Sequence, residues 1–223
     1  MKLHNFIVIF GTGVIFVSFI FSVFFLKKEK PAYYAHILIF IVLGLLLSIN
    51  TISNNNIAWI LNRKLSIFIE QALLTFQSLM LGLFFLNILN ASKFIFKAKY
   101  ILATSLILQC CLSLIVLTKN TEIRPSIIPN TVLLIFCFFY FKDLIKNKPT
   151  LVLANSAAFW VVLGIFYSCC IGFSVNFLIP FISKDPHTID LRLQIFSIAN
   201  IANIILYLFL IKSYLCLKHP QNS

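Results

Sequence analysis

The sequence has little charge for its length. Only 11% of its 223 residues are charged, and Asp and Glu together number 6, whereas a soluble domain is about 25% charged. Hydrophobic residues make up 61% of the chain, with Phe at 25 positions. A water-soluble globule of this size could not bury so much apolar surface, and a disordered chain requires low hydrophobicity. The composition therefore predicts a multi-pass membrane protein.

Sequence motifs of reaction chemistry are also absent. The chain has no Gly-rich loop for phosphates or dinucleotides, and its 4 His are too far apart for metal-ligand spacing. No two carboxylates share a hydrophobic run, although a membrane hydrolase normally requires such a pair or a metal. We therefore predict no catalytic residue, no metal site and no cofactor, and the sequence leans away from an enzyme. The 6 Cys lie in or beside hydrophobic runs, as small apolar residues do.

Seven hydrophobic runs approach or exceed the roughly 20 residues that a membrane-spanning helix needs. They cover 6–26, 35–53, 65–89, 100–118, 126–141, 151–181 and 193–212. The fifth is the weakest, and the sixth is long enough to require a tilt, a bend or an exit near Pro180. Because the connections are short, neighbouring helices are expected to be antiparallel. The sequence predicts one all-α domain, a bundle of seven transmembrane helices in a lipid bilayer.

The positive charges indicate how the bundle is oriented. The formal net charge is +12, and Lys and Arg are spread over the short connections, an arrangement that argues against a nucleic-acid partner. More of them follow the first, third, fifth and seventh runs than lie on the other side. Since connections rich in Lys and Arg stay in the cytoplasm, we expect the N-terminus outside and the C-terminus in the cytoplasm.

Polar residues mark one side of the third run. Glu70 is the only acid inside a run and lies about 8 Å from its start at 1.5 Å per residue. It either reaches outward to Arg63 or Lys64, or forms a ligand or proton site open to the outside. Gln77 follows on the same helix face, with Gln71 on an adjoining stripe. These amides serve either hydrogen bonds between helices or a pocket.

Two later runs carry similar stripes. In the seventh, Asn200, Asn203 and Tyr207 recur at helical spacing, and in the sixth Trp160 and Tyr167 share a predicted face with a glycine. Amides and aromatic rings favour either an apolar ligand pocket or tight helix packing. A pocket would open outward among the second, third, fifth, sixth and seventh spans. The candidate ligand-binding residues are Glu70, Gln71, Gln77, Asn130, Trp160, Tyr167, Asn200, Asn203 and Tyr207.

Two stretches resemble a known family. Phe159 to Tyr167 (FWVVLGIFY) and Asn200 to Tyr207 (NIANIILY) resemble the last two helices of bacterial seven-helix membrane sensor regions, which often adjoin a histidine kinase. Few residues follow Lys212, so no attached kinase is expected. The resemblance implies a sensor in the bacterial cytoplasmic (inner) membrane that relays to a separate partner at the cytoplasmic loops or in the membrane. Its ligand would come from the outer side or from the lipid.

Two other classes remain open at this point. A small transporter or channel subunit requires a continuous polar path, so water would reach Gln109 and Tyr167 from both sides of the membrane. A scaffold or assembly subunit of a membrane complex requires a stripe of small or polar residues that faces lipid in the isolated chain.

Overall fold

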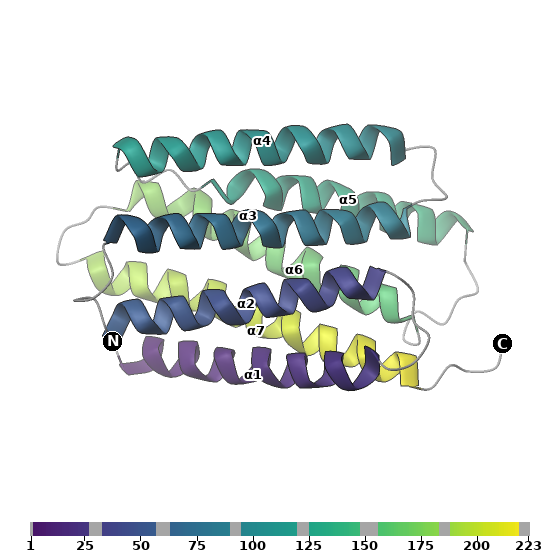
Figure 1. The fold of residues 1–223 in the computed structure, drawn as a ribbon, viewed down its shortest axis with the longest axis horizontal. Coiled ribbons are helices and arrows are strands. Elements are labelled where there is room, and N and C mark those ends of the chain that lie inside the picture. Colours follow the sequence, from purple (N-terminus) through teal and green to yellow (C-terminus); the bar gives the residue numbers. More distant parts are fainter. Residues whose placement is uncertain are drawn as a thin grey trace.

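The chain forms a bundle of seven long helices (Figure 1). The computed structural model describes residues 2–26, 33–56, 63–89, 95–119, 125–147, 156–182 and 188–218. The long helices are α1 Lys2–Leu26, α2 Tyr33–Asn56, α3 Arg63–Ile88, α4 Ile95–Lys119, α5 Ile127–Asn147, α6 Ala157–Leu178 and α7 Ile189–Lys218. All seven are long and apolar enough to cross a membrane. The predicted all-α multi-pass bundle is confirmed.

The helix ends differ from the predicted runs. The weak fifth run becomes a helix that continues past the predicted end, to Asn147. Its last turns include charged residues, so the apolar stretch alone did not mark this end of the helix. The sixth run begins later than predicted, at Ala157, where the Ser156 side chain accepts a hydrogen bond from the Phe159 N–H as a helix cap. Residues 151–155 lie outside the described part. Pro180 lies in the 3₁₀ turn η2, Ile179–Phe181, which follows α6.

Six of the helices form a ring. Consecutive helices contact each other, α1 also packs against α7, and α3 also touches α5. The ring α1–α2–α3–α5–α6–α7 is therefore closed, and α4 packs outside it against α3 and α5. Figure 1 shows α4 along one edge of the bundle and α1 along the opposite edge. We call the end where α1 begins the N-side and the end where α7 ends the C-side.

The outer helix α4 attaches by one stripe. Its buried residues recur at helical spacing and, apart from Leu102, are small or polar: Ala98, Leu102, Ser105, Gln109 and Ser113. Leu102 lies directly over Gly82 of α3, where any larger residue would meet its methyl groups. Ser113 donates a hydrogen bond of 3.3 Å to Oε1 of Gln71 on α3. The other face of α4 is exposed and apolar, as contact with lipid requires.

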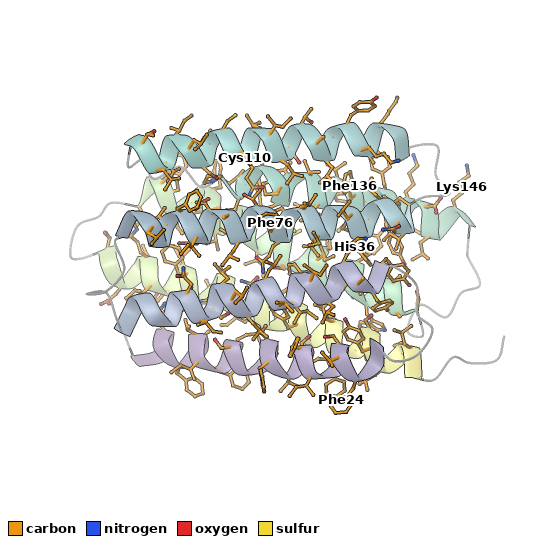
Figure 2. All side chains as sticks on the ribbon, in the orientation of Figure 1. Phe24, His36, Phe76, Cys110, Phe136 and Lys146 are labelled. Carbon is orange, nitrogen blue, oxygen red and sulfur yellow. The ribbon has the colours of Figure 1, made fainter. Side chains whose placement is uncertain are left out.

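The C-side half of the ring, here called the packed half, is filled by aromatic rings. Its fully buried side chains include Tyr34, Phe84, Phe85, Phe136 and Tyr214. Neighbouring rings have centroids 5.4 to 5.7 Å apart, within the range of favourable ring pairs. The Tyr34 hydroxyl also bonds the Ser213 hydroxyl at 2.9 Å and ties α2 to α7. Figure 2 shows Phe136 between the helices and Phe24 pointing away from them.

Candidate functional site

The N-side half of the ring, here called the hollow half, encloses a cavity of about 440 Å³. All six ring helices line it, and α4 contributes no residue. On α7 the lining extends from Phe196 to Tyr207, and on α6 from Asn176 to Ile165. At 1.5 Å per residue each stretch spans about 16 Å, roughly half of a 30 Å hydrocarbon core. The cavity therefore reaches from the N-side to mid-membrane depth.

Polarity changes along the depth of the cavity. The lining residues nearest the N-side, one from each helix segment, are polar except for Phe196: His4, Thr51, Glu70, Ser126, Asn176 and Phe196. The deepest lining residues, one from each helix, are apolar except for Tyr207: Ile15, Phe40, Leu81, Leu133, Ile165 and Tyr207. The mouth is therefore suited to polar groups and the floor to apolar groups, with the Tyr207 hydroxyl as the exception.

Tyr207 and Phe40 form the floor as a stacked ring pair. Their centroids are 5.9 Å apart, and their planes differ by 20°. Gly44 of α2 makes room for them, because a Cβ at this position would meet the Tyr207 hydroxyl. The same Cβ would lie 3.3 Å from Nε2 of Gln77 on α3. Three helices thus bring a hydroxyl and an amide together just above the floor.

The walls carry amides that are fixed by neighbouring helices. Asn203 of α7 accepts a hydrogen bond of 3.1 Å from the Ser168 hydroxyl of α6. Asn130 of α5 accepts one from the Cys169 thiol, with 3.9 Å between sulfur and oxygen. At the mouth, His4 Nδ1 and the Ser197 hydroxyl lie 3.1 Å apart and link α1 to α7. These contacts hold the polar walls in place without filling the space between them.

The described part of the cavity lining contains no Lys or Arg, although the chain carries a net charge of +12. Glu70 is the one acid among these described lining residues. An anion placed at this depth would lose its hydration without gaining a cationic partner, which is costly in a low-dielectric site. Among the described residues, no group of three His, Cys, Asp or Glu side chains lies close enough to hold a metal ion.

The structure brings six of the nine candidate residues to the cavity. They are Glu70, Gln77, Asn130, Asn200, Asn203 and Tyr207. It does not bring Gln71, Trp160 and Tyr167 there. Gln71 turns to Ser113 of α4, and Tyr167 is exposed on the outside of the bundle.

Trp160 of α6 lies on a face that packs against α7, the alternative to a pocket that the sequence left open for this stripe. Trp160 stacks on Phe209 of α7 at 5.5 Å, and Lys212 Nζ lies 5.9 Å from its ring. Gly164, on the same face, lies close against α7, since a Cβ added there would lie 2.9 Å from the Cβ of Phe209. The cavity face of α6 instead carries Ile165, Ser168, Cys169, Gly172 and Asn176. The predicted face packs against α7 because Gly164 leaves no side chain to hold the two helices apart.

The contribution of α1 was missed by the sequence analysis. Its lining residues are His4, Ile7, Val8, Gly11, Thr12 and Ile15, which recur at the spacing of one helix face. Gly11 meets Ile204 of α7 at close range, where a Cβ would lie 3.3 Å from Cγ1 of that side chain. The signal was present, since His4, Gly11 and Thr12 fall on this one face.

Comparison of the chain with protein-family models, with curated proteins and with solved structures finds no match. The fold and the cavity therefore carry the functional argument.

Proposed function

We propose that this multi-pass membrane protein binds a small molecule in the hollow half and signals its presence to a protein partner. The observation that carries the proposal is the cavity itself. Its volume of about 440 Å³ falls in the range of roughly 300–1,000 Å³ typical of small-molecule sites. Apolar walls combined with a few converging amides and hydroxyls are also typical of such sites.

The closed floor supports binding over conduction. A channel needs a polar path that continues through the membrane. Below Phe40 and Tyr207 the ring is filled by side chains with no exposed surface, including Ile37 and Leu210. A transporter or channel subunit is therefore the second candidate, because it would require the packed half to open.

The helices that form the site also connect it to the C-side. Asn200, Asn203 and Tyr207 line the cavity on α7, and Ser213 of the same helix bonds Tyr34 of α2 in the packed half. A ligand that prefers one position of α7 would shift the population of this contact by its difference in affinity for the two states. The likeness to bacterial seven-helix sensor regions agrees with this role. On this proposal the mouth faces the outside of a bacterial cytoplasmic membrane and the partner binds at the inner, basic loops.

The first experiment identifies what the protein carries. The full chain is purified into lipid nanodiscs without harsh detergent and analysed by native mass spectrometry. We expect a small molecule at a stoichiometric level, and we expect Asn200→Leu to reduce its occupancy at least fivefold. Asn87→Leu is the matched control, because Asn87 is exposed on α3 and bonds only the Leu83 carbonyl of its own helix.

The outcomes separate the candidate functions. A ligand lost from Asn200→Leu and kept by Asn87→Leu supports the proposal. A stoichiometric protein partner without any small molecule would contradict it and support a scaffold or assembly subunit. Uptake of the identified molecule into sealed vesicles would move the assignment to a transporter.

A further inference from the structure

The volume of the cavity restricts the size of its ligand. About 440 Å³ lies toward the lower end of the roughly 300–1,000 Å³ that small-molecule sites occupy. A membrane lipid with two long chains would exceed this volume, whereas a molecule with a single chain would not.

The polarity of the cavity sets the direction of that molecule. Amide and hydroxyl groups gather toward the mouth, as Thr51, Ser126 and Asn176 show, and the floor is formed by apolar side chains such as Ile15 and Leu81. A hydrocarbon end is stable against the floor, because burial there removes apolar surface from water. A polar end is stable among the amides, which can both donate and accept hydrogen bonds.

The charge of the described lining disfavours an acidic head group. Among the residues that the structure describes, the lining has no Lys or Arg, and it contains the Glu70 carboxyl. Neutral hydroxyl or amide groups can instead bond with Asn130, Asn200 and Asn203 without any loss of ionic hydration.

We infer, on the basis of the binding function proposed above, that the ligand is a single-chain amphiphile without an acidic head group and that the Phe40–Tyr207 ring pair limits its chain length. The chain end rests on the two stacked rings, and the head group lies at the level of the wall amides. The rings act as a stop because Ile37 and Leu210 fill the space around the next helix turn without exposed surface. Phe40 and Tyr207 are thus the residues that determine specificity for length.

The test uses saturated monoacylglycerols of increasing chain length as uncharged probes. They are titrated onto the full chain in lipid nanodiscs, and the bound fraction is measured by native mass spectrometry. We expect the bound fraction to rise with chain length and then to fall at least tenfold beyond a limiting length. Fatty acids of the same chain lengths are expected to bind at least tenfold more weakly, because their head group is anionic.

Variants of the two rings then locate the limit. Tyr207→Leu and Phe40→Leu are each expected to move the limiting length to longer chains, and Tyr207→Phe to leave it unchanged because the ring remains. Two independent ring variants keep the test decisive if one of them fails to fold. Tyr167→Leu is the matched control, since Tyr167 is exposed on α6 and does not line the cavity.

The failures of the inference and of the proposed function look different. Binding without a length limit, or with a limit that neither ring variant moves, overturns the inference. So does equal binding of the fatty acids. If monoacylglycerols do not bind but another small molecule binds the protein and is lost from the Asn200→Leu variant, the inference fails and the binding function stands. If no small molecule of any kind binds, both fail.

Discussion

The two halves of the ring are built from the same helices and differ in what lies between them. The packed half is filled by large rings such as Phe84, Phe85 and Phe136, whereas the lining of the hollow half mixes glycines and short polar side chains with aliphatic ones. Lipid gives helices no hydrophobic reason to associate, so van der Waals packing and hydrogen bonds hold them together. The packed half supplies most of that packing, and this leaves the other half of the same helices open for a ligand.

The difference indicates where stability and function reside. Changes in the packed half are expected to affect the free energy of unfolding first. Changes in the hollow half are expected to affect ligand retention first. The following substitutions test this division, beginning with the largest expected effect.

Removal of one aromatic ring from each half is the most direct comparison. Phe84→Ala is expected to reduce stability by about 3–5 kcal/mol, because Phe84 has no exposed surface and its neighbours cannot fill the space. Phe196→Ala at the cavity mouth is expected to cost less than about half of this, since its ring is only partly buried. Thermal unfolding in one fixed detergent measures both. Equal losses would contradict the division.

A methyl group added at two glycines tests the close approach above the floor. Gly44→Ala is expected to destabilise by about 1–3 kcal/mol through overpacking against the Tyr207 hydroxyl. Gly13→Ala on α1 should instead stabilise by up to about 1 kcal/mol, because nothing lies within 4 Å and Ala favours helices. Unfolding midpoints of the two variants should move in opposite directions.

The double variant identifies the clashing atom. Tyr207→Phe removes the hydroxyl, so it should recover part of the stability lost in Gly44→Ala. A purely additive double variant would show that Gly44 does not make room for this group.

Two glutamines, one on α4 and one on α3, differ in whether their side-chain amides are paired. Gln109 is fully buried on α4, and neither of its amide atoms has a hydrogen-bond partner among the described residues. Gln109→Leu should therefore stabilise by about 1 kcal/mol, since an unsatisfied polar group is removed. Gln71→Leu should destabilise by about 0.6 kcal/mol, the typical value of one hydrogen bond between membrane helices. The same sign for both variants in an unfolding titration would refute this account.

The smallest expected difference compares one hydrogen bond from each half. Tyr34→Phe should cost about 1 kcal/mol, because it leaves the buried Ser213 hydroxyl unpaired. Ser168→Ala should cost about 0.5 kcal/mol or less, since Asn203 stays accessible in the cavity after the loss. Unfolding titrations should rank Tyr34→Phe as the more damaging change.

The fold could be predicted from the sequence because length and apolar composition decide whether a helix crosses a membrane. The stripe on α7 was also predictable, since Asn200, Asn203 and Tyr207 are the main polar groups of their run and share one face. The same holds for Gln77, which follows Glu70 at two helical turns. In each case a polar group that faced lipid would cost free energy, so the polar face of the helix is expected to turn toward the interior of the bundle.

The rest of the site depends on which helices become neighbours. Trp160 and Tyr167 looked suitable for a pocket, but Gly164 between them draws α7 onto that face. The polar stripe of α4, with Gln109 and Ser113, is similar in sequence to a pocket wall and in fact attaches α4 to the outside of the ring. Spacing along one helix shows which residues share a face, and only the tertiary contacts show what that face meets.

The contact between α1 and α7 has a consequence for biosynthesis. It joins the first and the last of the seven helices, so the ring cannot close until α7 has entered the membrane. Until then Thr12 of α1 and Ser168 of α6 border an open seam, and Ser168 lacks its partner Asn203. Polar groups at such a seam are costly in lipid. An unfinished chain therefore differs from a finished one by an exposed polar seam, a feature that membrane quality control could recognise while six of the helices are already in place.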